Sequence, residues 1–526
     1  MISKKAASFF VLIATAAAVP AIIIWLGREQ KKTVPARNYA LIEPGEAMNS
    51  IVRKAAGVVP APRQWAWQSR EFAAFFHFGV NTFTDREWGD GTEDPGMFNP
   101  TDFDARQWVW IIKSAGMKTL ILTAKHHDGF CLWPSAETTH SVKSSPWRGG
   151  KGDVVGEVAA ACREFGIGFG FYLSPWDRHE PSYGDSPRYN EHFRRQLREL
   201  LTNYGPVAEV WFDGACGEGP NGKRQEYDWA SYYRTIREIQ PEALVAIMGP
   251  DARWVGRESG TGRETEWSVL PVRTPIPVEV AASTDPFAMD AVFVPRDLTD
   301  VDLGSREKLA GATALIWYPA ETDVSIRPGW FYHASQDGEV KSPERLLEIY
   351  ESSIGRNGVL LLNIPPDKRG RIHENDEKSL RGLRRILDLT YGTNLAAAAA
   401  VRASGAAAGH GPKNILDDDP DTFWTTPEGG EKAEIEIDLS APAEFDRLVL
   451  QEYIRAGQRV EGFSLDIEDG GAWKPLARGT TIGFKRILRF PPVSARKVRL
   501  VVEKSRTNPM LSSFGLYRSP VKGEAR

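Results

Sequence analysis

The stretch "EVWFDGACGEG", Glu209–Gly219, joins an apolar strand directly to a bare acid. Val210, Trp211 and Phe212 have the character of a buried strand, and Asp213 ends it just before a glycine. Asp followed by Gly is a common turn pair, so this carboxylate either begins a turn or is a catalytic group held at the end of a core strand. The choice between the two interpretations depends on the rest of the chain.

Short apolar runs alternate with longer amphipathic ones from about residue 65 to residue 395. The apolar runs predict strands at 71–80, 118–129, 167–174, 209–214, 243–250, 311–319 and 359–366. The amphipathic runs predict helices at 104–116, 153–166, 189–205, 228–240, 342–358 and 375–392. Gly166 has the position of a helix C-cap.

This alternation predicts an α/β fold, and at this length a (β/α)8-type barrel is favoured. A doubly wound sheet is the alternative, but no Gly-rich phosphate loop follows the first predicted strand. Barrel enzymes carry their chemistry at the carboxyl ends of the strands. The polar residues at those ends are His77, His126, His127, Asp128, Tyr172 and Asp213. Their gathering there favours the catalytic interpretation of Asp213.

The composition argues against a nucleic-acid partner and against a fold held by disulfide bonds. The net charge is −4 and no basic run is present, which argues against a nucleic-acid partner. The 17 tryptophans suit either a large core or stacking on sugar faces. Cys131, Cys162 and Cys216 form no metal-type pair, and their odd number argues against a disulfide framework.

The N-terminus predicts export. Lys4 and Lys5 precede an apolar run that ends at Leu26, so residues 1–26 are either a cleaved signal peptide or an N-terminal membrane anchor. We therefore expect a periplasmic or secreted protein that touches a membrane only through this segment, if it is retained. Residues 27–62 are polar and contain prolines, which predicts a linker.

Two folded domains are expected beyond the linker. Residues 63–393 form the predicted catalytic barrel. Residues 394–520 begin with an Ala/Gly-rich stretch and continue as short alternating strands, which predicts a β-sandwich domain.

Acidic residues in the loop at 249–269 add candidates for acid–base chemistry. Glycoside cleavage needs one carboxylate at the anomeric carbon and one carboxylic acid that protonates the leaving oxygen. Asp213 provides the first, and Glu258, Glu264 or Glu266 the second. Each glutamate also fits an ordinary surface loop.

The adjacent His126 and His127 suit either metal binding or hydrogen bonding to sugar hydroxyls. Neighbours on a strand point to opposite sides, which disfavours a metal site and leaves one imidazole as a candidate core residue. The chain contains no G-x-S-x-G, H-E-x-x-H or P-loop motif, so serine-hydrolase, zincin and NTPase chemistry lack their signatures.

Seven motifs follow one another between about residues 68 and 390. They are "FHFGVNTFTDREWGDG", "TAKHHDGFCLWPS", "GFYLSPWD", "VWFDGA", "GRESGTGRETEWSV", "IRPGWFYH" and "NGVLLLNIPPDKRGRIHEND". Together they resemble the α-L-fucosidases of glycoside hydrolase family 29, in particular the branch that prefers α-1,3/4-linked fucose.

The resemblance implies a retaining double displacement on a fucosylated oligosaccharide or glycoconjugate, with no required cofactor and no metal in the active site. It implies Asp213 as nucleophile and Glu258 as acid/base, 45 residues later. The implied substrate-binding residues are His77, Glu87, Trp88, His126, His127, Tyr172, Trp211 and, on the aglycone side, Trp330.

The segment "KNILDDDPDTFWTT" resembles discoidin-like (F5/8 type C) domains. Its acidic residues suit either a structural Ca²⁺ site or a solvated turn. They are Asp417, Asp418, Asp419 and Asp421.

Three rival functions stay open from the sequence. One is an α-L-fucosidase of another linkage preference, and a second is a catalytically inactive glycan-binding protein. The third is a metal-dependent barrel hydrolase, which a chelator would inactivate.

Overall fold

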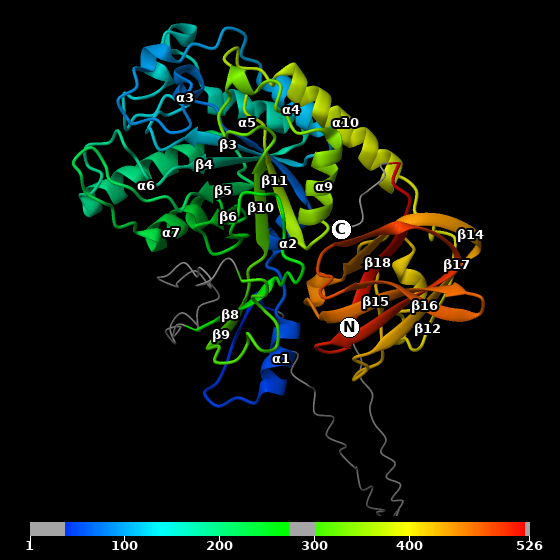
Figure 1. Ribbon diagram of the computed structural model, residues 1–526. Helices are drawn as coiled ribbons and strands as arrows, with labels where there is room; N and C mark the ends of the chain where they lie inside the picture. The colour runs from blue at the N-terminus through cyan, green and yellow to red at the C-terminus, as the bar shows by residue number, and fades with distance from the viewer. Residues whose placement is uncertain (1–36, 274–299, 521–526) are drawn as a thin grey trace, which may run out of the picture. The chain divides into compact units, whose positions relative to one another are not determined.

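The computed structural model describes residues 37–273 and 300–520 (Figure 1). The predicted signal peptide or membrane anchor at 1–26 lies outside the described residues and stays a prediction. None of the helices within the two described ranges combines the length and apolarity that crossing a bilayer requires.

The first domain is a barrel of eight parallel strands. In spatial order they are β6 (Leu244–Ile247), β5 (Glu209–Phe212), β4 (Gly168–Leu173), β3 (Thr119–Lys125), β2 (Phe72–Phe76), β11 (Gly358–Asn363), β10 (Ala320–Ser325) and β7 (Arg253–Trp254). A parallel bridge between Ala246 and Ala252 joins the two ends of this order. The predicted barrel is confirmed, and the doubly wound alternative is wrong because the strand order never reverses.

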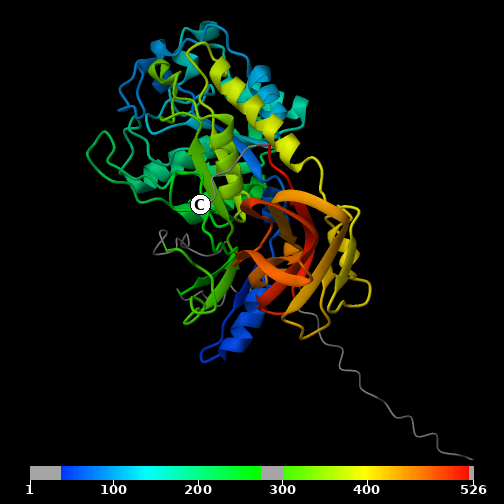
Figure 2. The same ribbon diagram turned by 45° about the vertical axis from the view of Figure 1, so that its right-hand side comes forward.

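Helices lie around the outside of the strands (Figures 1 and 2). They are α4 (Ala105–Ser114), α5 (Val154–Phe165), α6 (Ser186–Asn203), α7 (Trp229–Ile239), α9 (Pro343–Ser353) and α10 (Glu374–Tyr391). Every residue of β2 and β3 is buried, because inward side chains fill the barrel and outward ones contact helices. Polar groups on these strands therefore reach solvent only near the strand ends.

Local capping sets where the helices begin and end. The Asp104 carboxylate accepts the Gln107 N–H at the start of α4, and Asp153 accepts the Gly156 N–H at the start of α5. Gly166 ends α5 with φ of 69°, a left-handed conformation that glycine adopts without steric cost. The predicted C-cap is confirmed.

The sequence does not predict β10, whose residues "AETDVS" look too polar for a core strand. Glu321, Asp323 and Ser325 are nevertheless buried on it. Their partners explain this, since Glu321 accepts the Trp211 indole N–H at 2.7 Å and Asp323 accepts that of Trp254 at 2.7 Å. Buried polar groups are tolerated when they are hydrogen-bonded.

The strand predicted at 311–319 exists but lies outside the barrel. It is β9 (Ala314–Trp317), which pairs in an antiparallel sheet with β1 (Tyr39–Leu41) and β8 (Val269–Val272). β10 takes the barrel position instead.

The interpretation of 27–62 as a linker is wrong for residues 37–62. This stretch contains β1 and the helix α1 (Met48–Gly57), and α2 (Pro62–Gln68) begins at its end. Ile51, Val52 and Ala55 are buried on α1, because helical spacing collects them on one face that packs against the β8–β9 sheet.

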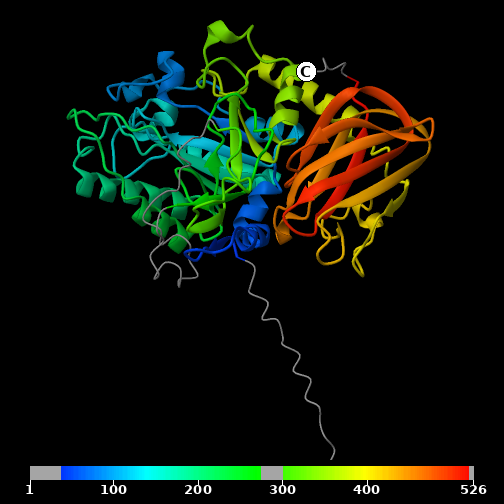
Figure 3. The same cartoon turned by 60° about the horizontal axis from the view of Figure 1, so that its bottom comes forward.

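The C-terminal domain is an antiparallel β structure with its own hydrophobic core (Figure 3). Its strands are β12 (Ala400–Ala403), β13 (Trp424–Thr425), β14 (Ala433–Glu452), β15 (Val460–Asp469), β16 (Ala472–Gly479), β17 (Arg486–Ser505) and β18 (Met510–Tyr517). β14 pairs with β12 through its first half and with β18 through its second. The long strand β14 thus joins β12 and β18 within one seven-stranded antiparallel sheet, and the predicted β-sandwich fold of this domain is confirmed.

A buried ion pair lies beneath the carboxyl end of β3. The Lys125 Nζ is 2.8 Å from the Asp177 Oδ2 and 2.9 Å from the Gln196 Oε1, and the Lys125 side chain is fully buried. Burial opposes ionisation of Asp177, but the ammonium group outweighs it and brings the pKa of Asp177 to about 2.

We predict that Lys125→Met lowers the free energy of unfolding by about 3–5 kcal/mol, because it leaves the Asp177 charge buried without its partner. Urea denaturation measures the change. The control is Arg106→Ala, which breaks an ion pair with Glu164 whose side chains are 66% and 45% exposed. That loss should be about 0–1 kcal/mol. Equal losses in the two variants would contradict the account.

Candidate active site

Asp213 follows β5 at the mouth of the barrel, with its side chain 27% exposed. Its Oδ1 accepts the Ala215 N–H at 2.7 Å, and its Oδ2 accepts the Tyr172 hydroxyl at 3.1 Å. Tyr172 pairs with Trp211 in the parallel register of β4 and β5. Asp213 lies two residues past Trp211, so strand pairing brings the phenol and the carboxylate together.

Three imidazoles stand beside this carboxylate. The His127 Nε2 lies 3.9 Å from the Asp213 Oδ2, and the rings of His126 and His127 are centred 4.2 Å apart. The ring of His77 is 5.7 Å from that of His126. The expectation that His126 and His127 point to opposite sides is wrong, because β3 ends at Lys125 and strand alternation does not extend to them.

Burial keeps these imidazoles neutral. Burial lowers the pKa of His77 to about 3 and also lowers the pKa values of His126 and His127. Repulsion between the protonated forms of neighbouring imidazoles lowers the pKa values of His77 and His126 further. Neutral imidazoles both donate and accept hydrogen bonds, which suits recognition of hydroxyl groups.

Hydrogen-bond partners fix the tautomer of His127. The Ser174 hydroxyl donates to the Trp176 carbonyl at 2.6 Å, so the 2.7 Å contact of His127 Nδ1 with the Ser174 Oγ requires a proton on Nδ1. The His127 Nε2 near Asp213 is then a free acceptor. By the same logic, the Asn363 Oδ1 accepts the Nδ1–H of His77 at 2.8 Å. Asn363 was not predicted, although the motif "NGVLLLNIPP" contains it.

Aromatic rings form the floor beneath Asp213. Trp211 is 6% exposed, and its ring lies 5.2 Å from the rings of both Tyr172 and Phe75. Trp330 covers another side, with its ring 5.2 Å from that of His77. Both tryptophans are therefore part of the same pocket as the imidazoles.

The structure distinguishes the three loop glutamates. Glu258 is exposed, and its Oε2 accepts the Trp330 indole N–H at 3.3 Å. Glu264 forms ion pairs with Arg356 and Arg486, and the buried Glu266 pairs with Arg253 and Arg263. Among these three glutamates, Glu258 is the one whose hydrogen bond or ion pair within the described residues reaches a candidate site residue, Trp330.

Glu87 and Trp88 lie at the rim. The Glu87 carboxylate accepts the backbone N–H of Trp330 at 2.9 Å and contacts the His333 Nε2 at 2.7 Å, so it holds the Trp330 segment in place. Trp88 is 55% exposed, with its ring 5.4 Å from that of His127 and 5.8 Å from that of Trp176. His333 and Trp176 were missed as site residues, although "RPGWFYH" and "SPWD" contain them.

Among the described residues, no group of three or more His, Cys, Asp or Glu side chains forms a metal site. Asp421, one of the proposed calcium ligands, pairs with Arg455, and Asp417 accepts the Thr422 hydroxyl at 2.8 Å. These contacts are those of a capped turn, and the calcium site stays a prediction.

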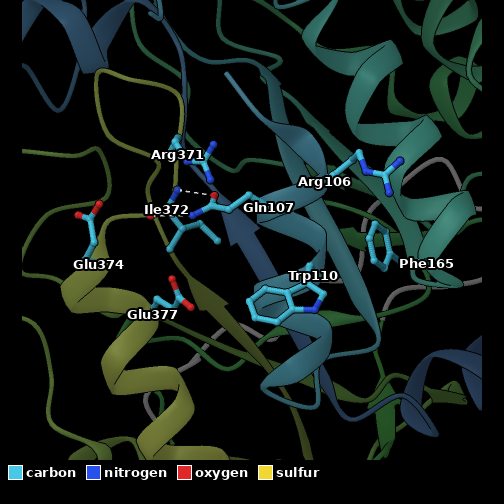
Figure 4. A pocket seen from close by; sticks show the side chains of 8 residues that line it. All are labelled: Arg106, Gln107, Trp110, Phe165, Arg371, Ile372, Glu374 and Glu377. Atoms are coloured by element: carbon cyan, nitrogen blue, oxygen red, sulfur yellow. Dashed lines mark hydrogen bonds between the residues drawn. The ribbon is translucent and has the colours of Figure 1, made fainter. Parts of the chain in front are cut away.

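A separate hollow of about 460 Å³ opens between α4 and α10 (Figure 4). Its lining residues are Arg106, Gln107, Trp110, Phe165, Arg371, Ile372, Glu374 and Glu377. None of the candidate site residues is among them, so this hollow is distinct from the barrel mouth.

A barrel that gathers an acid, neutral imidazoles and tryptophans at its carboxyl face defines a glycoside-hydrolase type of site. The α-L-fucosidase family model matches residues 55–264 and 283–390, and the F5/8 type C domain model matches residues 400–514. The chain belongs to the α-L-fucosidase family, glycoside hydrolase family 29, and carries a C-terminal F5/8 type C domain. It is an α-L-fucosidase.

Relatives agree over most of the chain. It is 43% identical over 480 residues to α-L-fucosidase 1 of Arabidopsis thaliana, covering 89% of both proteins. A family 29 structure from an unknown rumen bacterium has 40% identity and a TM-score of 0.73, covering 88% of this chain and 78% of that one. A Ruminococcus gnavus GH29 fucosidase in complex with fucose has 34% identity and a TM-score of 0.76, covering 88% of this chain and 95% of that one.

His333 makes the rim sensitive to pH. Its Nδ1 is 2.8 Å from the Asp85 Oδ1 and its Nε2 is 2.7 Å from the Glu87 Oε1, so both nitrogens must carry protons. Burial opposes this charge, but the bonds to Asp85 and Glu87 outweigh it and raise the pKa of His333 above its ordinary 6.5. The charged link is complete below pH 6.5 and is lost as the pH rises through the raised pKa.

We predict that KM rises with pH across that window, because neutral His333 releases Glu87 and loosens Trp330. His333→Gln should raise KM at low pH by about tenfold or less and remove this step from the KM profile. Steady-state kinetics from pH 5 to about 9 measure it. His410→Gln, in the C-terminal domain, is the control and should keep the wild-type profile. A step that survives in His333→Gln would assign it to another group.

Proposed function

We propose that this α-L-fucosidase acts by a retaining double displacement with Asp213 as nucleophile and Glu258 as acid/base. The observation that carries the proposal is the environment of Asp213. It is a partly exposed carboxylate after a barrel strand, held by the Tyr172 hydroxyl and the Ala215 N–H. Glu258 joins the same pocket through Trp330, whose ring lies beside His77.

In the first step, the Asp213 carboxylate attacks the anomeric carbon while the glycosidic C–O bond breaks. Glu258 gives its proton to the leaving oxygen, which departs as the aglycone hydroxyl. In the second step, the Glu258 carboxylate takes a proton from water, whose oxygen attacks the same carbon. The ester to Asp213 then breaks, and fucose leaves with its original anomeric configuration.

The remaining candidate residues would bind the sugar. Neutral His77, His126 and His127 offer donors and acceptors to its hydroxyls. Trp211 would support the apolar C–H face of fucose, with Tyr172 beside it, and Trp88 would close the rim. Trp330 would contact the aglycone, because its indole also bonds to the proposed acid/base. Glu87 would act on the sugar directly or through the Trp330 segment that it holds.

We predict that Asp213→Asn abolishes turnover without unfolding the protein. Glu258→Gln should lower kcat/KM on a natural glycan by about 10²–10⁴-fold, but much less on an aryl fucoside whose leaving group needs no proton. Glu264→Gln is the matched control from the same loop and should stay close to wild type in turnover. Proton NMR of the first-formed fucose anomer tests retention, which an inverted product would disprove.

We also propose a preference for α-1,3/4-linked fucose. It is supported by the resemblance of the segment 256–269 to that branch, and by Trp88 and Trp330, two aromatic rings at the rim that suit a branched aglycone.

To test linkage, the purified protein is incubated with a trisaccharide that carries α-1,4-linked fucose and with a matched α-1,2-linked one, with and without chelator. We expect free fucose from the first substrate only, at equal rates in both conditions. Release from both substrates would discard the linkage preference. Loss of activity with chelator would favour the metal-dependent alternative, and binding without release would favour the inactive glycan-binding alternative.

The natural substrate is proposed to be a fucosylated oligosaccharide or glycoconjugate outside the cytoplasm. The basic and apolar pattern of residues 1–26 supports export to the periplasm or medium. Retention of that segment would anchor the enzyme to a membrane, and its cleavage would release the enzyme.

A further inference from the structure

Two carboxyl groups are buried inside the barrel under the proposed fucose site. Glu209 belongs to β5 and Glu321 to β10, and both side chains are fully buried. The Glu209 Oε2 accepts the Trp67 indole N–H at 2.9 Å. The Glu321 Oε1 accepts the Trp211 indole N–H at 2.7 Å. One oxygen of each carboxyl group is therefore satisfied by an indole.

The other oxygen of each carboxyl group is left without such a donor. The Glu209 Oε1 and the Glu321 Oε2 are buried and have no N–H or O–H donor among the described residues. The two carboxyl groups are within hydrogen-bonding reach of each other. Two buried acceptors in contact are unfavourable unless a proton lies between them.

We propose that Glu209 and Glu321 share one proton and that this pair is a positioning device for Trp211 in the floor of the fucose pocket. The part about Trp211 rests on its proposed role in sugar binding. The shared proton satisfies both inner oxygens, and the two indole N–H groups stabilise the single negative charge from outside.

The charges around the pair agree with one shared proton. Burial raises the pKa of both carboxyl groups, and repulsion by Glu209 adds to the rise for Glu321. Arg70 favours the ionised form of Glu209, and Glu321 in turn interacts with the buried Asp323 on its own strand. Because a cation favours the ionised form of Glu209 but none favours that of Glu321, full ionisation of the pair is unfavourable.

The position of the Trp211 side chain affects Asp213 through Tyr172. Its ring lies 5.2 Å from that of Tyr172, whose hydroxyl donates to the Asp213 Oδ2 at 3.1 Å. If Glu321 released the indole, Trp211 would gain freedom next to Tyr172. The proposed nucleophile would then lose part of its support without losing any direct contact.

Glutamine variants separate a shared proton from two independent acids. In Glu209→Gln, the amide oxygen accepts from Trp67 and the amide N–H donates to the Glu321 carboxylate, which reproduces the shared proton. Glu321→Gln does the same in reverse. With both amides present, two NH2 groups meet, or one turns its NH2 toward an indole N–H, so the double variant cannot satisfy every group.

We expect each single variant to keep kcat/KM within about threefold of wild type, because its hydrogen bonds are complete. Glu209→Gln/Glu321→Gln should lose about 5- to 150-fold in kcat/KM and melt at a lower temperature. The control is Glu242→Gln/Glu344→Gln, which changes two exposed acids of the same barrel and should match wild type. Additive losses, with each single variant already impaired, would overturn the shared proton.

A second measurement detects the proton shared by Glu209 and Glu321 in the absence of substrate. Infrared difference spectra near neutral pH should show one protonated-carboxyl component that Asp213→Asn and Glu258→Gln keep and that Glu209→Gln and Glu321→Gln each lose. Buried Asp128, Asp323 and Glu452, whose pKa values are also raised, contribute absorption that all four variants keep. A difference spectrum in which either glutamine variant loses no component would overturn the pair. If Trp211→Phe left KM unchanged, Trp211 would not be a sugar-binding residue, and the positioning role of the pair would fail. The infrared band and the melting temperatures would still test whether Glu209 and Glu321 share a proton. The two failures are thus distinguishable.

Discussion

The closed parallel hydrogen bonding of eight strands is the constraint on which the rest of this enzyme depends. It buries both faces of each strand, so a polar side chain either emerges at a strand end or finds a partner inside. Asp213 and the imidazoles emerge at the carboxyl ends. Lys125 and Asp177 pair beneath them. The same constraint therefore gathers the polar groups of the candidate site at the barrel mouth and buries the acids below them, where each needs a partner or a proton.

Burial then sets the electrostatics of the pocket. The imidazoles are neutral because desolvation lowers their pKa values, and Tyr172 stays protonated because burial and Asp213 raise its pKa. A neutral lining lets one carboxylate dominate the local field. Such surroundings suit the role of nucleophile that we propose for Asp213.

Much of this arrangement could be predicted from local patterns. Apolar runs ending in His77, Tyr172 and Asp213 mark strands whose ends carry chemistry. The helix α1 and the strand β10 were missed for opposite reasons. The apolar face of α1 is short and surrounded by polar residues, so it looked like a linker. The strand β10 carries acids, and their burial is understandable only once Trp211 and Trp254 are seen beside them.

By itself, the sequence determined the barrel, the β-sandwich and the motifs of the fucosidase family, because these depend on periodicity and on residues close together in the chain. The tertiary structure alone decided that Glu258 contacts Trp330, that His333 holds Glu87, and that Glu321 holds Trp211. The physical reason is distance along the chain. Trp211 and Glu321 are separated by 110 residues, and only the closure of the barrel brings their side chains to 2.7 Å.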